Sequence, residues 1–278
     1  MPASLKEFFA RHQRIFVLTG AGISTASGIP DYRDESGEWK QQKPMDYRDF
    51  VNSHQARQRY WSRSFVGWQR FQQANPNPAH AALVRLEQQG RLIRTVTQNV
   101  DGLHQRAGSR LITELHGSLA EVECLDCATL IPRASLQQRL LAGNPLLAHL
   151  SAQLAPDGDA VLQDYDENDL HVPDCKACGG MLKPAVVFFG ETVPAVRVES
   201  CFDALRQADA MLVVGSSLMI YSGFRFARAA AQAGLPIAAI NRGRTRADDL
   251  IELKLETDCA TALNAAIGGL ETGIADCG

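Results

Sequence analysis

The sequence predicts an α/β protein in which a parallel sheet carries helices on both faces and is interrupted by two insertions that pack together as a smaller domain. Short apolar, β-rich runs recur along the chain, and a helix-like stretch precedes each later run, which predicts the large domain. An aromatic segment and a cysteine-rich segment break this alternation and predict the smaller one. The chain has 278 residues, 45% of them hydrophobic and 21% charged, which suits a globular protein of this size.

The first predicted strand spans residues 15–19 and ends at the turn Gly20-Ala21-Gly22. A continuously apolar run bounded by glycine is typical of a buried strand in a parallel sheet. The turn is similar to the dinucleotide fingerprint, in which glycines let backbone N–H groups approach a pyrophosphate. Because position 25 is threonine where that fingerprint has its third glycine, the pattern favours a nucleotide site of a different arrangement.

Residues 45–75 form the first insertion, in which aromatic side chains recur at spacings of three and four. This periodicity predicts one or two amphipathic helices. The α/β alternation then resumes with a predicted helix at 79–89 and a strand at 92–97.

The second insertion, residues 124–178, opens and closes with a Cys-x-x-Cys pair. A tight turn within each pair aims both sulfurs at one ion, so the four thiolates predict a closed, structural zinc site. The ligands are Cys124, Cys127, Cys175 and Cys178. The 47 residues between the pairs exceed the spacing of compact zinc ribbons and are expected to hold a helix near 136–141. His171 is the alternative ligand, and Cys201, Cys259 and Cys277 are interpreted as free thiols.

The last third of the chain predicts two further helix–strand pairs, 195–207 with 210–214 and 224–233 with 236–240. Four of the predicted strands end in small or polar residues: the glycine turn, Gln98-Asn99, Gly215-Ser216-Ser217 and Asn241. Ligands bind at the carboxyl ends of strands in open parallel sheets, so we expect a site where these ends meet.

Charge and hydropathy exclude other classes of protein. The chain carries 28 Lys and Arg against 31 Asp and Glu without a basic block, which argues against nucleic acid as a partner. Its apolar runs are far shorter than the roughly 18 residues that span a bilayer, so we expect no membrane association. The N-terminus has no apolar signal region, and paired cysteines favour a reducing compartment, so we expect a cytoplasmic protein.

Together these motifs resemble the sirtuins, the NAD-dependent protein deacylases, from about residue 8 to 265. The resemblance rests on Gly20 to Arg33, Gln98 to Asp101, His116-Gly117, the cysteine pairs, Lys183 to Glu191, Gly215 to Ser217 and Asn241. Residues 59–61, 65–68, 155–159 and 221–223 resemble the class II branch, whose animal members are mitochondrial.

The resemblance implies a Rossmann-like NAD-binding domain, residues 1–36, 78–117 and 182–278. It also implies a small domain, residues 37–77 and 118–181, which combines a helical module with the zinc module. NAD and the acylated lysine would bind in the cleft between them. The implied NAD-binding residues are Gly20, Ala21, Gly22, Ser24, Asp31, Tyr32, Arg33, Gln98, Asn99, Asp101, Gly215, Ser216, Ser217, Asn241 and Cys259.

The implied catalytic residues are His116, Asn99 and Asp101. In the implied reaction the acyl oxygen of the substrate attacks the ribose as nicotinamide leaves, and His116 as base helps a ribose hydroxyl take the acyl group. Free lysine and O-acyl-ADP-ribose are the products. An imidazole whose ordinary pKa is about 6.5 suits a base near neutral pH.

The implied partners are acyl-lysine proteins, and Val186, Val187 and Phe188 match the strand that pairs with the substrate backbone. Tyr60 and Arg63 have the spacing with which some sirtuins bind an acidic acyl chain, because residues three apart share a helix face. The alternative for this pair is a packed tyrosine beside a solvated or ion-paired arginine. The preferred acyl chain and the oligomeric state stay open.

Several alternatives remain at this point. Tyr32 and Arg33 suit a solvated turn, His116 a hydrogen-bonded turn histidine, His104 either the site or the core, and His80 a structural role at a helix start. Mono-ADP-ribosyl transfer and a non-catalytic, zinc-stabilised binding module are the competing functions. His116 favours deacylation over both, because capture of the acyl group is the step that needs a base.

Overall fold

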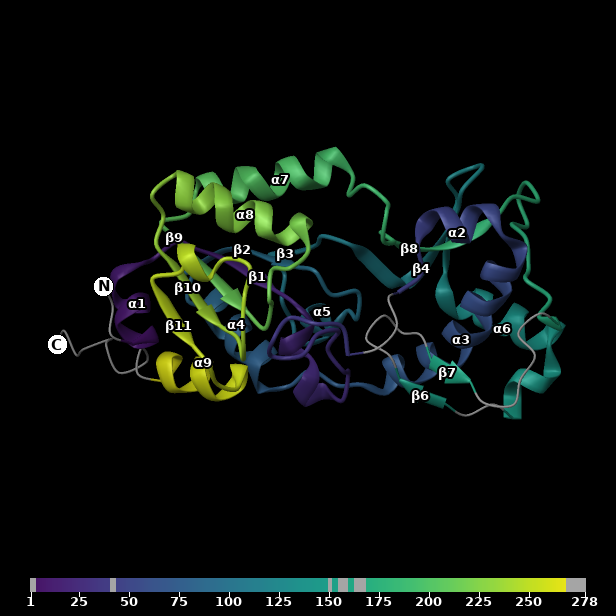
Figure 1. Ribbon diagram of the computed structural model, residues 1–278, viewed down its shortest axis with the longest axis horizontal. Helices are drawn as coiled ribbons and strands as arrows, with labels where there is room; N and C mark the ends of the chain where they lie inside the picture. The colour runs from purple at the N-terminus through teal and green to yellow at the C-terminus, as the bar shows by residue number, and fades with distance from the viewer. Residues whose placement is uncertain (1–3, 41–43, 150–151, 155–159, 163–168, 269–278) are drawn as a thin grey trace.

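The computed structural model describes residues 4–40, 44–149, 152–154, 160–162 and 169–268, which form two lobes (Figure 1). The larger lobe holds both ends of the described chain and a six-stranded sheet. The smaller lobe holds the aromatic and the cysteine-rich insertions. Residues 155–159, part of the class II resemblance, lie outside the described residues.

The sheet is parallel throughout, in the order β11-β10-β9-β1-β2-β3. At its centre the last residue of β1, Thr19, is level with the last residues of both neighbours, Thr97 and Val214. The carboxyl ends of the three central strands therefore reach one edge together. The strands are β1 (Ile15–Thr19), β2 (Leu92–Thr97), β3 (Ile112–Glu114), β9 (Ala210–Val214), β10 (Ile237–Ile240) and β11 (Leu253–Leu255).

Alternate residues of the central strands enter two separate cores, one on each face of the sheet. Ile15 and Val17 of β1 pack with the helices α1 (Leu5–Arg11), α4 (Pro78–Gln88) and α9 (Cys259–Ile267). Phe16 and Leu18 pack with α7 (Ala195–Arg206) and α8 (Tyr221–Gln232) on the opposite face. Because both faces are covered, the strands carry no polar alternation, as expected for a parallel sheet. The predicted fold class is confirmed.

A third core lies in the smaller lobe. It joins α2 (Tyr47–Asn52), α3 (His54–Gln73) and α6 (Arg133–Gly143) to an antiparallel sheet of order β5-β4-β8. The strands are β4 (Gly117–Cys124), β5 (Leu130–Pro132) and β8 (Leu182–Val186). A separate antiparallel pair, β6 (Ala152–Leu154) and β7 (Ala160–Leu162), contacts α3. Both insertions thus share one core, while the exact domain boundaries stay a prediction.

Four predicted strands and the predicted helices are present, with ends shifted by a few residues. The helix expected near 136–141 is α6, and α8 begins three residues before the expected Phe224. The sequence analysis did not identify α1, α9 or the short edge strands β3 and β11. No helix in the described part of the chain combines the length and the apolarity that a membrane span requires.

Candidate active site

A cavity of about 420 Å³ opens where the carboxyl ends of the central strands face the smaller lobe. Its size is within the range of small-molecule sites. The large lobe contributes the turns after β1, β2, β9 and β10, and the smaller lobe contributes Tyr60 and residues that follow β8. The predicted site residues that line it are Gly20, Ala21, Gly22, Asp31, Tyr32, Arg33, Tyr60, Gln98, Asn99, His116, Val186, Val187, Phe188, Gly215, Ser216, Ser217 and Asn241.

Two glycine turns touch at the floor of this cavity. The N–H of Gly22 donates to the carbonyl of Gly215 at 2.9 Å, and the N–H of Gly20 donates to the carbonyl of Val214 at 3.1 Å. A Cβ atom at Gly22 would lie 2.9 Å from the backbone of Gly215. Glycine is therefore needed for the two turns to approach, and their small residues leave room for a ligand.

Behind the cavity, a chain of hydrogen bonds fixes Asn99. Its side-chain amide donates to the carbonyl of Gly20 at 3.2 Å and to the hydroxyl of Ser24 at 3.1 Å. The Ser24 hydroxyl in turn donates to a carboxylate oxygen of Asp101 at 2.7 Å. Asp101 lines a small adjoining hollow shared with Asn99 and is linked to the wall of the main cavity by these hydrogen bonds.

Gln98 holds the next part of the wall. Its backbone N–H donates to the carbonyl of Thr19 at 2.9 Å, and its side-chain oxygen accepts from the Ser216 hydroxyl at 2.7 Å. The carboxamide is thus oriented by the turn after β9.

His116 follows β3 and lies between Gln98 and α8. Its Nδ1 is 2.9 Å from the carbonyl oxygen of Gln98, and its Nε2 is 2.8 Å from the hydroxyl of Ser222. Burial lowers the pKa of His116 to about 4, with a smaller opposing effect of the Gln98 carbonyl and smaller lowering effects of Arg197 and Arg225. The imidazole is therefore neutral near pH 7, as a general base must be.

Tyr32 and Arg33 are half-buried and pack against the ring of Trp39. The guanidinium of Arg33 lies 4.0 Å from the centre of the Trp39 ring and donates to the carbonyl of Gly37 at 2.6 Å. Trp39 also contacts the rings of Tyr32 and Phe189. An ion pair of 2.6 Å between Lys40 and Asp31 closes the segment. These contacts place Tyr32 and Arg33 against the cavity.

The predicted substrate-pairing segment, Val186 to Phe188, is held in place by the buried side chain of Lys183. Strand β8 ends at Val186, and the N–H of Val187 donates to the carbonyl of His116 at 2.8 Å. Lys183 donates to the carbonyl of Val186 at 2.6 Å and forms ion pairs with Glu123 at 2.9 Å and Glu191 at 3.4 Å. Because these groups fix the backbone beside His116, they position the cavity wall.

Besides Asp101, three predicted residues lie apart from the main cavity surface. Arg63 is half-buried and is not among the described residues that line the cavity. Ser24 is buried behind it. Cys259 begins α9 behind the glycine turn, where its sulfur is 4.0 Å from the carbonyl oxygen of Gly22, and burial raises its pKa to about 12. Asn241 lines the cavity and donates to the carbonyl of Arg242 at 2.8 Å.

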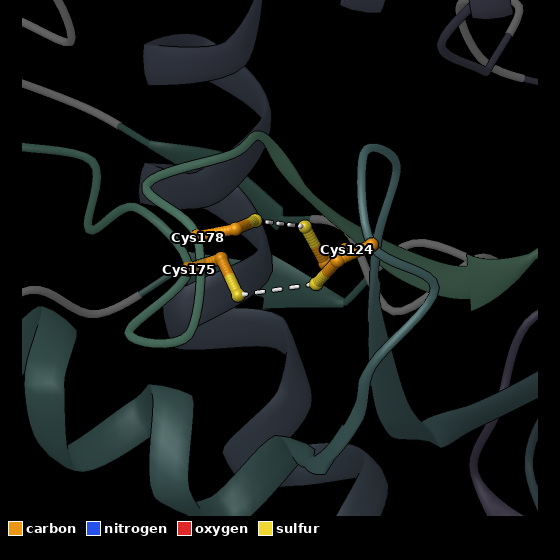
Figure 2. A group of neighbouring side chains, drawn as sticks. Cys124, Cys175 and Cys178 are labelled. Atoms are coloured by element: carbon orange, nitrogen blue, oxygen red, sulfur yellow. Dashed lines mark hydrogen bonds between the residues drawn. The ribbon is translucent and has the colours of Figure 1, made fainter.

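The four predicted zinc ligands meet at one point of the smaller lobe (Figure 2). Their sulfur atoms all lie within 4.8 Å of one another, with Cys124 3.5 Å from Cys178 and Cys127 3.8 Å from Cys175. A tetrahedral Zn²⁺ with Zn–S bonds of about 2.3 Å places its sulfurs about 3.8 Å apart. The cluster therefore fits a zinc ion with no open position, and none of the four cysteines lines the cavity, as expected for a structural ion.

Each cysteine pair makes the same turn. The N–H of Ala128 donates to the carbonyl of Cys124 at 3.0 Å, and the N–H of Gly179 donates to that of Cys175 at 2.8 Å. Both residues after the pairs have positive φ, 57° at Ala128 and 77° at Gly179. The repeated turn points both sulfurs of each pair toward the other pair.

The sequence analysis missed two side chains that shape the site, Ser222 and Trp39. Ser222 was noted only as part of a class II segment, and Trp39 lies between the glycine turn and the first insertion. Nothing in the local sequence marks either of them, because their partners are distant or lie across a turn.

The chain is similar to known proteins of one family. The model of the Sir2 family matches residues 20–222. A protein of Bradyrhizobium diazoefficiens named NAD-dependent protein deacetylase 2 is 57% identical over 260 residues, 94% of this chain and 95% of its own. A Bos taurus protein named NAD-dependent protein lipoamidase sirtuin-4, mitochondrial, is 49% identical over 262 residues, 93% of this chain and 83% of its own.

A solved structure described as Sir2-p53 peptide-NAD+ has a TM-score of 0.78 at 29% identity and covers 98% of this chain and all of its own. Another, described as Sir2 bound to acetylated peptide, has a TM-score of 0.75 at 28% identity with the same coverage. The likeness to the bovine protein agrees with the class II resemblance. On the family match and on these identities, the chain belongs to the Sir2 family.

Proposed function

We propose that this protein is an NAD-dependent protein lysine deacylase that transfers the acyl group of an acyl-lysine to ADP-ribose and releases nicotinamide and free lysine. One observation carries the proposal: His116, Gln98 and Asn99 face a single cavity, with Asp101 one hydroxyl behind Asn99. The bacterial relative that is named a deacetylase covers almost the whole chain, which supports the same activity here.

The residues around the cavity suit NAD. The turns at Gly20 to Gly22 and at Gly215 have no side chains at their contact, so their backbone is exposed to the cavity. The cavity wall also supplies the carboxamides of Gln98 and Asn99 and the hydroxyl of Ser217. When bound there, NAD supplies a ribose whose bond to nicotinamide is broken and whose hydroxyl accepts the acyl group. Gln98 and Asn99 would hold that ribose and the carboxamide of nicotinamide, and Asp31, Tyr32 and Arg33 would close over them.

His116 performs the proton transfer in this proposal. Its Nδ1 faces a carbonyl, so Nδ1 carries the hydrogen and Nε2 the lone pair, which a ribose hydroxyl would reach in place of the Ser222 hydroxyl. A group of this kind supplies about 10²- to 10⁴-fold in rate. The negative charge of Asp101, transmitted through the Ser24 hydroxyl and the Asn99 amide, would favour the positive charge that develops on the ribose as nicotinamide leaves.

The substrate peptide would pair with the backbone from Val186 to Phe188, a mode of recognition that reads little of the side chains. The aliphatic stem of its lysine would then enter beside Phe188 and Tyr60, two buried aromatic residues whose rings lie 5.2 Å apart. For the acyl end we keep the prediction that Tyr60 and Arg63 recognise an acidic chain. Boundaries of the two domains and a cytoplasmic location also stay predictions.

A panel of acyl-lysine peptides incubated with NAD tests the function. Mass spectrometry is expected to detect nicotinamide, deacylated peptide and O-acyl-ADP-ribose in equal amounts. ADP-ribosylated protein in place of O-acyl-ADP-ribose would contradict the proposal and favour mono-ADP-ribosyl transfer. Absence of both products with every acyl chain would favour the binding module.

A further inference from the structure

The hydroxyl of Ser222 lies 2.8 Å from Nε2 of His116, the ring nitrogen that faces away from the Gln98 carbonyl. The two residues are 106 positions apart in the chain, so the contact is made by the fold. Ser222 is 9% exposed and lines the same cavity as His116. The contact is therefore formed at the site and is part-buried.

The hydrogen-bond partners of His116 determine which hydrogens take part. A backbone carbonyl only accepts, so Nδ1 must carry the hydrogen that it receives. In the neutral ring Nε2 is then a lone pair, and the Ser222 hydroxyl must donate to it. One tautomer satisfies both contacts.

The first turn of α8 is built to bring this hydroxyl to the ring. Ser222 is the second residue of the helix, and Gly223 follows it. A Cβ atom at Gly223 would lie 2.6 Å from the side-chain nitrogen of Gln98, so glycine lets the helix end approach the wall that also supports His116. The same Gln98 provides the carbonyl for Nδ1.

We propose that Ser222 is a positioning residue for His116: by donating to Nε2, its hydroxyl holds the imidazole in the Nδ1–H tautomer at the wall of the cavity. The inference rests on the proposed function for its catalytic meaning, but the contact itself does not. Nε2 has one lone pair, so a ribose hydroxyl would have to take the place of the Ser222 hydrogen at Nε2 before it gives up its proton. Ser222 thus holds the neutral ring in place until that exchange.

Two arginines on the neighbouring helices also favour the neutral form of His116. Arg197 of α7 donates to the carbonyl of Leu115, and both it and Arg225 of α8 lower the pKa of His116, after the larger effect of burial. A hydrogen bond donated to the neutral ring favours that form as well. Loss of the Ser222 hydroxyl is therefore expected to raise the pKa of His116.

The first arm of the test follows His116 by ¹⁵N NMR in the protein without NAD or peptide, so it does not depend on the proposed function. In Ser222→Ala the His116 titration is expected to move upward by about half a pH unit or more. Ser222→Thr keeps the hydroxyl and is expected to titrate like the unchanged protein. The control is Ser200→Ala, an exposed serine of α7. An unchanged His116 titration in Ser222→Ala would overturn the proposal.

The second arm compares two steps of the reaction. Exchange of labelled nicotinamide into NAD reports the first step, which needs no base, and O-acyl-ADP-ribose formation reports the step that His116 assists. Ser222→Ala is expected to slow product formation by about 3- to 10-fold at pH 7 with exchange retained, and Ser222→Thr to restore it. An equal loss of both steps, or no loss of either, would overturn the positioning role. If the unchanged protein catalyses neither step, the proposed function fails and the NMR arm still decides the contact.

Discussion

At the scale of single residues, Tyr60 both packs and faces the cavity. Its ring lies 5.5 Å from that of Phe50 and 5.2 Å from that of Phe188, and it is 4% exposed. Arg63, one helical turn further along α3, is half-buried outside the described cavity lining. The packed tyrosine of the alternative interpretation is therefore present, and recognition of an acidic chain depends on whether Arg63 can reach an acyl group beside Tyr60.

Substitution Arg63→Ala tests that recognition. If Arg63 binds a substrate carboxylate, kcat/KM for succinyl and glutaryl peptides is expected to fall by 10-fold or more, with acetyl peptides little affected, because a charge-assisted hydrogen bond contributes about 1.5–3 kcal/mol. Steady-state kinetics on matched peptides measure this. Equal losses on acidic and acetyl peptides would assign Arg63 a structural role.

Three histidines lie near the site, His80, His104 and His116, and their different hydrogen-bond partners indicate different roles. His80 accepts the N–H of Asn77 at the start of α4, which confirms its structural role, and His104 is 1% exposed with its Nε2 3.0 Å from the Thr19 hydroxyl. Among these three, His116 lines the cavity. The sequence could separate His116 by its motif, but it could not place His104 or find Ser222, since both depend on contacts between distant segments.

At the scale of elements, the predictable parts are those with long apolar runs. Strands such as β1 and β9 are buried at every residue, so their sequences alone distinguish them. The edge strands β3 and β11 have three residues each, all half-buried, and carry no such signal. The junction of the two glycine turns was equally invisible, because it requires the register of β1 against β9.

The contact between the two glycine turns predicts that Gly215→Ala lowers both the stability of the protein and its affinity for NAD. Gly215 has a φ of +60°, and a Cβ atom there would lie 2.3 Å from the backbone nitrogen of Ile23. We expect a loss of roughly 2–4 kcal/mol in unfolding free energy from overpacking and left-handed strain, together with weaker NAD binding. Denaturant unfolding and calorimetric titration with NAD measure the two effects.

Gly234→Ala is the matched control for this substitution. Gly234 has a similar φ of +69°, but nothing lies within 4 Å of its Cβ position. Its cost is expected to be the strain alone, about 1 kcal/mol, with NAD binding retained. Equal effects of the two substitutions would mean that the contact between the turns does not matter.

At the scale of the whole molecule, the two lobes are stabilised differently. The large lobe has a core on each face of its sheet, whereas the smaller lobe joins two separate insertions around one core and the four cysteines. The zinc site could be predicted from the sequence because two Cys-x-x-Cys pairs supply all four ligands by themselves. The sharing of one core by segments far apart in sequence was expected, but the contacts between them were not predictable.

Removal of zinc is expected to unfold the smaller lobe and spare the sheet. Without the ion, four thiolates would repel one another, and the binding free energy, on the order of 10 kcal/mol, would be lost from folding. Hydrogen exchange after chelation should show loss of protection in β4, β5 and β8 with β1 and β9 still protected. Unchanged protection in the zinc-free protein would contradict a structural ion.

The three buried histidines predict a loss of stability in mild acid. Burial lowers the pKa values of His80 and His116 to about 4 and that of His104 to about 3, below the unfolded value of about 6.5. The unfolded chain therefore binds more protons between these values. Stability is complete above about pH 6.5 and falls toward pH 4, by roughly 1.4 kcal/mol per pH unit for each histidine.

Unfolding by urea at several pH values measures this slope. His104→Gln is expected to flatten this dependence of stability on pH between pH 6.5 and pH 4 by about one histidine's share. An unaltered slope in His104→Gln would contradict a neutral, buried His104.

The most direct test of the account is the formation of O-acyl-ADP-ribose by His116→Ala in the presence of NAD and an acyl-lysine peptide, with NAD affinity measured on the same preparation. If one cavity brings the imidazole and the two carboxamides to a single ribose, product formation is expected to fall by roughly 100-fold or more while NAD still binds. Product formation at the rate of the unchanged protein would show that His116 is not the base and that the chemistry takes place elsewhere.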